Sequence, residues 1–147
     1  MAVGVRVDPF AGFRFVVEVE GLLVAGFSEV SGLQGEIETT PFREGGVNGY
    51  AHALPGPAAY PTLVLRRGLT EVDNLWSWHR DVARGLIRRR NGSVILAAGL
   101  GHGGWRWNFT GAYPVRWTGP QLRGDATTVA VETLELAHRG LTKALLR

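Results

Sequence analysis

The sequence predicts a mainly β protein, an antiparallel barrel or sandwich with one flanking helix. Two observations predict this class. Apolar and polar residues alternate with a period of two in several short segments, and glycine-containing turns separate those segments. A single stretch shows helical periodicity instead. Because strands and helices do not alternate along the chain, a parallel sheet is excluded and antiparallel pairing is expected.

The first strand is expected at residues 13–19, where phenylalanines and valines alternate with charged residues. A tight turn at Gly21 would join it to a second short strand at 22–27 as a hairpin. Segments rich in β-branched and aromatic residues predict the remaining strands. They are 35–42, 62–66, 93–98, 105–109, 112–117 and 127–137. The C-terminal segment 141–147 is too short to form a helix on its own.

One helix is expected over about residues 71–84. Thr70 is the expected N-cap residue of a start that is similar to a capping box, with acidic residues expected in the first turn. Apolar residues then recur at helical spacing, and Gly85 ends the segment. The helix therefore presents one apolar face for packing against the sheet.

Residues 43–61 are expected to form a long irregular loop. Its length exceeds the roughly 12–15 residues usual for a loop without a specific role. It carries Tyr50, Leu54 and Tyr60, which a purely flexible loop does not need. We expect this loop to dock either on its own domain or on a neighbouring molecule.

The chain has 147 residues, of which 21 are glycine and none is cysteine. This length predicts a single domain, residues 1–147. The missing cysteines exclude disulfides and thiolate metal sites. Residues 1–73 hold nine acidic residues and five arginines, a net charge of −4, whereas residues 74–147 carry +7. This asymmetry suits copies that meet head to tail, although a random surface distribution would look the same.

No catalytic or metal-binding arrangement is visible in the sequence. The four histidines, at positions 52, 79, 102 and 138, form no zinc motif. Gly99–Gly104 matches a dinucleotide-binding pattern, but a strand follows it where a helix is required, so a hairpin loop is expected. We predict no enzyme activity, catalytic residue, metal or cofactor. The N-terminus does not resemble a signal peptide, and no apolar run could span a membrane.

Arg88, Arg89 and Arg90 leave two interpretations open. Together with the tryptophan-rich segment 105–117, they could form a nucleic-acid-binding surface on a monomeric module. We favour a solvated basic corner or a surface that pairs with acids of another subunit, because no nucleic-acid-binding module surrounds them.

An ordered set of motifs resembles the inner tube proteins of phage-tail-like contractile injection systems. The family includes T4-type tail tube proteins and the type VI secretion tube protein, and the resemblance covers about residues 8–140. The motifs are Asp8-Pro-Phe10, Phe13-Arg-Phe15, residues 26–33, Arg43-Glu-Gly-Gly46, Leu54-Pro-Gly56, Leu65-Arg-Arg-Gly68, Leu75-Trp-Ser-Trp78, Arg89-Arg-Asn-Gly92, Trp107-Asn-Phe109, residues 113–120 and residues 132–138.

The resemblance implies a single tail-tube domain, a β-barrel-like subunit with a flanking helix. Six copies would form a ring, and rings would stack into a hollow tube that a contractile sheath propels. Partners would be the sheath, baseplate or spike proteins, tube-terminating proteins and effector cargo in the lumen, with no specific nucleic acid and no membrane insertion. The particle would assemble in the cytoplasm and stay there or be released.

The long loop and the opposite charges predict contacts between subunits or between rings. Deleting residues 45–58 is expected to abolish tubes and leave a folded protein. The candidate contact residues are Glu36, Glu38, Phe42, Arg43, Glu44, Val47, Tyr50, Leu54, Tyr60, Arg88, Arg89 and Arg90.

Overall fold

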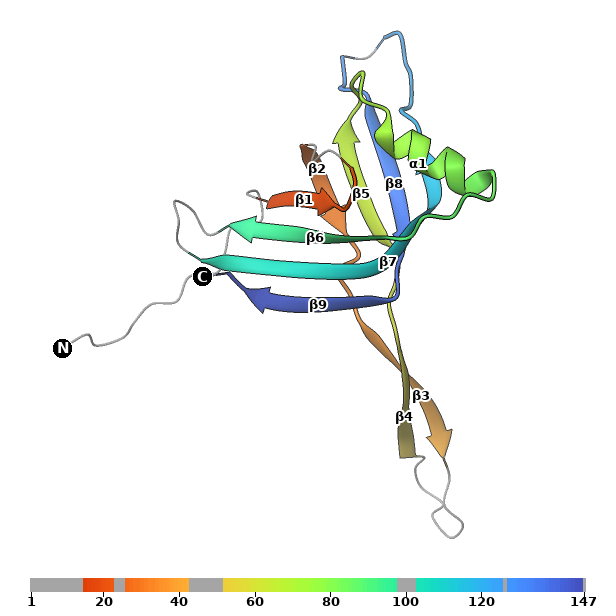
Figure 1. Cartoon of the computed structure of the whole chain (residues 1–147), viewed down its shortest axis with the longest axis vertical. Helices are drawn as coiled ribbons and strands as arrows, with labels where there is room; N and C mark the ends of the chain where they lie inside the picture. Colours follow the sequence, from red (N-terminus) through yellow and green to blue (C-terminus); the bar gives the residue numbers. More distant parts are fainter. Residues whose placement is uncertain (1–14, 23–25, 43–51, 98–102, 126, 147) are drawn as a thin grey trace, which may run out of the picture.

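Two antiparallel sheets share one long strand, and a separate two-stranded hairpin projects from them (Figure 1). The computed structural model describes residues 15–22, 26–42, 52–97, 103–125 and 127–146. The elements in this part of the chain are β1 (Phe15–Val19), β2 (Phe27–Ser31), β3 (Glu36–Phe42), β4 (His52–Ala59), β5 (Leu63–Gly68), α1 (Asn74–Ala83), β6 (Arg90–Ala97), β7 (Gly104–Thr118), β8 (Val131–Ala137) and β9 (Gly140–Leu145). The predicted antiparallel β class with a flanking helix is confirmed.

The shared strand is β7. Its first half pairs with β6 on one side and β9 on the other, and its second half pairs with β8. This gives a four-stranded sheet, β1-β6-β7-β9, and a second sheet, β7-β8-β5-β2. Gly111, with φ of 61°, lies between the two halves and allows the change of partner. The expectation of separate strands at 105–109 and 112–117 is therefore wrong, because one strand runs through this glycine.

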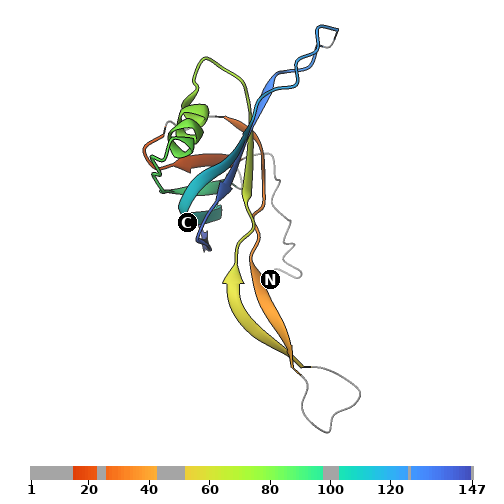
Figure 2. The same cartoon turned by 90° about the vertical axis from the view of Figure 1, so that its right-hand side faces the viewer.

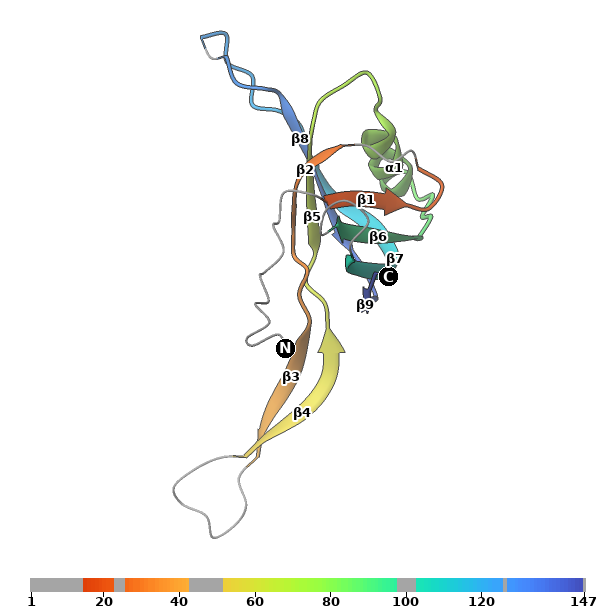
Figure 3. The same cartoon turned by 90° about the vertical axis from the view of Figure 1, so that its left-hand side faces the viewer.

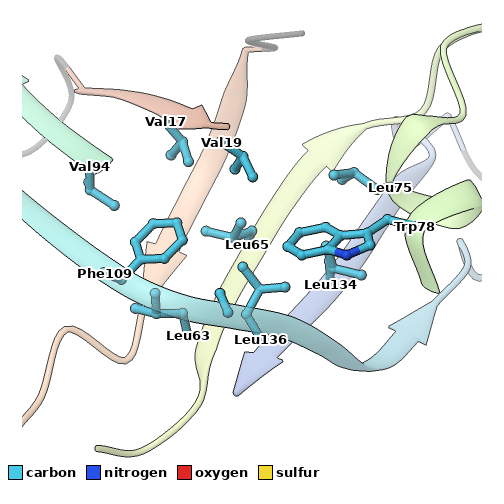
Figure 4. Close-up of a cluster of buried hydrophobic side chains, with 11 residues drawn as sticks. Val17, Val19, Leu63, Leu65, Leu75, Trp78, Val94, Phe109, Leu134 and Leu136 are labelled. Carbon is cyan, nitrogen blue, oxygen red and sulfur yellow. The ribbon is translucent and has the colours of Figure 1, made fainter. Parts of the chain in front are cut away.

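The core lies between the two sheets and is closed by α1 (Figure 4). Strand β8 shows the pattern clearly, since Glu132, Leu134 and Leu136 are buried and their neighbours less so. The buried apolar side chains are Val17, Val19, Leu63, Leu65, Leu75, Trp78, Val94, Phe109, Ala112, Leu134 and Leu136. The period-two alternation read from the sequence thus marks the sides of the sheets that face each other.

Gly92 is required by close packing where β6 passes β1 and β7. A Cβ at this position would lie 2.6 Å from the carbonyl oxygen of Glu18 and would collide with the ring of Phe109. Gly92→Ala is expected to destabilise the protein by about 1–3 kcal/mol, because neither neighbour can move without disturbing the core. Urea unfolding measures this. Gly124→Ala is the control, since no described atom lies within 4 Å of its added Cβ, and an equal loss in both variants would contradict the explanation.

Helix α1 is shorter at its start than residues 71–84 predict. Thr70 does not cap the helix, because its Oγ1 accepts the amide of Val72 at 3.2 Å and so stabilises the turn before it. Asp73 is the N-cap residue and makes no side-chain capping bond. Gly85, with φ of 91°, ends the helix as predicted. The side chains of Leu75 and Trp78 enter the core.

The expected hairpin at Gly21 does not form. Strand β1 pairs with β6 and β2 pairs with β5, so the chain crosses from one sheet to the other after β1. The amide of Glu20 instead bonds to the carbonyl of Asn91 at 2.9 Å. The second strand begins at Phe27, and residues 23–25 of the segment expected at 22–27 lie outside the described residues.

Strand β9 lies beyond the segment of about residues 8–140 that the resemblance covers. It pairs along the first half of β7, with Leu141 opposite Phe109 and Lys143 opposite Trp107. The residues of this strand do not alternate between apolar and polar, so no period-two pattern marks it in the sequence. A segment too short to form a helix on its own is long enough for an edge strand.

The expectation of an irregular loop at 43–61 is wrong for its second half. Strand β4 pairs with β3, from Glu36 opposite Ala59 to Phe42 opposite His52. The prolines of β4 are tolerated because a two-stranded ribbon leaves one edge of each strand free of ladder hydrogen bonds. Figures 2 and 3 show this hairpin extending far from the sheets. Arg43, Glu44, Val47 and Tyr50 lie outside the described residues.

Candidate assembly surfaces

The β3–β4 hairpin exposes both apolar and acidic side chains. Ile37 is 63% exposed and Leu54 is 47% exposed, and Glu36 and Glu38 are also exposed. A lone two-stranded ribbon is marginally stable in water, so these side chains suit a binding partner. Tyr60, at the base of the hairpin, packs instead on its own chain, with its ring centroid 5.6 Å from that of His138. Phe42 belongs to β3, and its side chain is outside the described set.

A second projection leaves the opposite end of the molecule (Figures 2 and 3). It is formed by residues 119–130, which connect β7 to β8, and we call it the β7–β8 connection. Leu122 is 80% exposed and Val129 is 78% exposed. Sequence reasoning missed this surface. The available signal was two large apolar residues inside a segment otherwise made of glycine, proline, alanine and polar residues.

The four-stranded sheet has two free edges, β1 and β9. Among the described residues, neither strand has a further strand on its outer side. Unpaired edges present rows of amide and carbonyl groups that can pair with another chain. These edges, together with the two projections, are the surfaces most suited to association with further copies.

The two faces of this sheet differ in polarity. One face packs on the core, and across the other face Glu18, Ser93, Asn108 and Thr142 lie in register on the four strands. Ser93 Oγ donates to Asn108 Oδ1 at 2.7 Å, and Arg106 Nη1 donates to Ser93 Oγ at 3.1 Å. Arg106 also lies 4.0 Å from a carboxylate oxygen of Glu18. A hollow of about 640 Å³ beside this row is lined by both polar and apolar groups, among them Glu18, Asn108 and Phe109. This face therefore carries one polar row, and the adjacent row adds Arg106 beside the apolar residues Val16, Ile95 and Ala144.

The three consecutive arginines do not form one free basic patch. Arg89 donates to the carbonyl of Gly111 at 3.3 Å and lies over the Tyr113 ring at 4.7 Å. Arg90 donates to the carbonyl of Glu20 at 2.8 Å. Arg88 is exposed, while its carbonyl accepts the indole N–H of Trp78 at 3.0 Å. Two of the three guanidinium groups thus serve contacts within the chain.

The tryptophan side chains of β7 also make contacts within the chain. Trp105 and Trp107 are half-buried, and the Lys143 ammonium lies 4.0 Å from the ring centroid of Trp105. Trp117 packs edge-on against Trp76, with centroids 4.8 Å apart. These contacts do not favour the interpretation of a base-stacking surface beside the arginines.

A buried ion pair holds the entry to α1 against the second sheet. Arg67 Nε donates to Glu132 Oε1 at 2.6 Å, and both side chains are almost fully buried. Arg67 Nη2 also donates to Asn74 Oδ1 at 2.7 Å and to the carbonyl of Val72 at 3.0 Å. Trp117 Nε1 donates to the other oxygen of Glu132 at 3.1 Å. This network connects β5, β8, β7 and the start of the helix.

The described ranges contain no group of three or more side chains placed to hold a metal ion. Their helix is also too short to cross a membrane. The features that stand out are the free edges, the polar sheet face and the two opposite projections. These are the features that a structural subunit could use to associate with further copies.

The family follows from the comparisons. The family model of the T4-like virus tail tube protein gp19 matches residues 11–142. The chain belongs to this family and is a tail tube protein of the contractile injection type, as its motifs indicate. No match was found among curated proteins. The structural role of the family implies a non-enzymatic function.

Solved structures share the fold over nearly the whole chain. A chain of the anti-feeding prophage baseplate, 6-fold symmetrised, is 26% identical with a TM-score of 0.85, covering 95% of this chain and 97% of its own. A chain of the PVC sheath-tube complex in the extended state is 22% identical, with a TM-score of 0.82 and coverage of 94% and 93%. Hcp1 from Flavobacterium johnsoniae is 16% identical, with a TM-score of 0.59 and coverage of 89% and 94%.

Proposed function

We propose that six copies of this chain form a ring, and that rings stack into the hollow tube of a contractile particle. A surrounding sheath propels this tube through a target envelope, with effector cargo in the lumen. The observation that carries the proposal is the four-stranded sheet with its two free edges. The similar chains come from a 6-fold baseplate and a sheath-tube complex, which supports the same ring and sheath.

Strand direction allows the sheet to continue from one copy to the next. Neighbouring strands of the four-stranded sheet are all antiparallel, so β1 and β9 run in opposite directions. When a second copy is placed by rotation about a ring axis, its β1 comes beside the β9 of the first. That junction is again antiparallel because the number of strands is even. Such a head-to-tail contact closes into a ring and leaves no edge of the four-stranded sheet exposed.

The polarity of the faces then orients the sheet. The second sheet and α1 cover the apolar face, so this bulk takes the wider outer radius and the polar face lines the channel. Glu18, Ser93, Arg106, Asn108 and Thr142 would contact the lumen. These polar and charged side chains would keep the channel hydrated and let cargo pass.

Cysteine cross-linking tests the junction, and the chain has no native cysteine to interfere. Glu18→Cys is combined with Thr142→Cys or Ala144→Cys, all on the polar face. Since side chains alternate between the faces, one of these combinations is expected to form covalent ladders up to six copies. Denaturing electrophoresis after oxidation or a short bis-maleimide measures the ladder.

Glu18→Cys with Lys143→Cys is the matched control, because Lys143 points to the opposite face. This pair is expected to stay monomeric on the gel. Equal ladders from all combinations, or no ladder from assembled wild-type-like rings, would exclude the β1–β9 junction. Absence of any ring from the unmodified chain would exclude the proposed function itself.

The remaining partners follow from the tube. We expect contacts with sheath, baseplate or spike proteins and tube-terminating proteins. The particle is expected to assemble in the cytoplasm. Arg88 and the hairpin acids Glu36 and Glu38 are exposed and remain candidates for pairing between copies.

A further inference from the structure

The two projections lie along the direction in which the ring would grow. The strands of the four-stranded sheet follow one another along the long axis of the molecule, with β1 nearer the β7–β8 connection and β9 nearer the β3–β4 hairpin (Figures 1 and 3). A neighbour joined through β9 therefore lies on the side to which the hairpin extends. The β7–β8 connection of that neighbour extends back toward the first copy. Both projections thus cross the same junction from opposite sides.

Both projections also arise from the second sheet. The hairpin continues from β2 and β5, and the β7–β8 connection continues from β7 and β8. They therefore lie on the outer side of the junction, while β1 and β9 meet on the channel side. The edge pairing leaves this outer side for the projections to fill.

The chemistry of the two projections is complementary. Ile37 and Leu54 of the hairpin are exposed, and so are Leu122 and Val129 of the β7–β8 connection. Apolar side chains this exposed gain free energy when another chain covers them. Glu36 and Glu38 give the hairpin a negative charge. Arg123 belongs to the connection, and its side chain is 63% exposed. It lies 3.5 Å from Asp125, but an exposed ion pair of this kind is weak, so Arg123 can also bind the acids of another copy.

We propose that the β3–β4 hairpin of each copy docks on the β7–β8 connection of the next copy in the same ring. This inference rests on the proposed ring. It assigns the partner of the hairpin and gives a role to the β7–β8 connection. The contact is heterologous, so every subunit supplies one hairpin and one connection.

The first test is the double variant Leu122→Glu with Val129→Glu. It removes apolar contact and places acids opposite the hairpin acids, so we expect at least a tenfold rise in the concentration needed for ring formation. Leu86→Glu with Ile87→Glu is the matched control, since these residues are 49% and 56% exposed but lie between α1 and β6. Native mass spectrometry measures the rings, and circular dichroism confirms the fold of both variants.

Charge reversal provides a second, independent test. Glu36→Lys with Glu38→Lys, added to the Leu122→Glu and Val129→Glu variant, is expected to restore rings. Restoration shows direct contact, because a general loss of stability would not be repaired by changes at the far end of the molecule. Two results would overturn the docking while leaving the tube function in place. One is unchanged ring formation by the Leu122→Glu and Val129→Glu variant. The other is a failure of Glu36→Lys with Glu38→Lys to restore its rings.

Mixing separates a heterologous from a symmetric contact. A hairpin-defective variant (Ile37→Glu with Leu54→Glu) is mixed with the Leu122→Glu and Val129→Glu variant. One intact hairpin then meets one intact connection, so pairs of the two variants are expected but closed rings are not. Rings from the mixture would overturn the proposal. Failure of the unmodified chain to form rings would instead count against the proposed function.

Discussion

Glu132→Ala is expected to destabilise the folded protein by about 3–5 kcal/mol, because it leaves the buried guanidinium of Arg67 without its counter-ion. The carboxylate accepts bonds from both Arg67 and Trp117, so the substitution also leaves the Trp117 N–H without this acceptor. Low dielectric surroundings make such unpaired groups costly. Urea unfolding followed by tryptophan fluorescence and circular dichroism measures the loss.

The exposed pair Arg66–Glu29 is the matched control on the same sheet. Its atoms are 3.5 Å apart, and both side chains are more than half exposed. Glu29→Ala is expected to cost no more than about 1 kcal/mol, since water replaces the lost partner. The combined replacement Arg67→Met with Glu132→Leu should recover part of the Glu132→Ala loss. Equal destabilisation by Glu29→Ala and Glu132→Ala would contradict the role given to the buried network.

Much of the fold could be predicted because burial follows local alternation. Strand β8 shows this, since Leu134 and Leu136 alternate with more exposed residues and the pattern gives both strand type and buried face. The same pattern puts Glu132 on the buried face. An acid in that register signals a buried basic partner, although the sequence does not say that this partner is Arg67.

Strand partners could not be predicted, because they depend on contacts between distant residues. The predicted turn at Gly21 does form, since the Leu22 amide donates to the Val19 carbonyl at 3.0 Å, but it joins no hairpin because β1 pairs with β6, in which Val17 lies opposite Val94. The β3–β4 hairpin was missed in part because proline propensity argues against a strand. In an isolated ribbon, proline can occupy positions whose backbone nitrogen faces the free edge, so it does not prevent a strand from forming.

The candidate contact residues were predictable only where length and composition marked them. The length of segment 43–61 made both Leu54 and Tyr60 candidates. In the structure they differ, because Leu54 is exposed on the projecting strand whereas Tyr60 packs on His138. Leu122 and Val129 gave no comparable signal. The role proposed for them depends on the β7–β8 connection projecting from the end opposite the hairpin, which only the three-dimensional arrangement shows (Figure 2).

Replacing residues 38–57 by Asn-Gly is expected to abolish rings and tubes while the body stays folded. The replacement keeps the Ile37–Ala58 pair and closes it with a two-residue turn. No buried core residue lies among the described side chains of the removed segment, 38–41 and 53–57, so the free energy of unfolding should change by less than about 1 kcal/mol, as for other surface changes. Negative-stain microscopy and native mass spectrometry measure assembly, and urea unfolding measures stability.

A milder variant tests whether assembly needs the exposed apolar side chains of the hairpin or only its backbone. Ile37→Ala with Leu54→Ala retains every backbone hydrogen bond of the hairpin and removes its exposed apolar groups. If docking depends on burying them, this variant should assemble more weakly than the unmodified chain, whereas Thr39→Ala should assemble normally. Wild-type rings from the Asn-Gly replacement would show that edge pairing suffices without the hairpin. A collapse of stability would show instead that the hairpin supports the fold. The expected combination, full stability with no rings, would place the function of these residues between subunits and not within one.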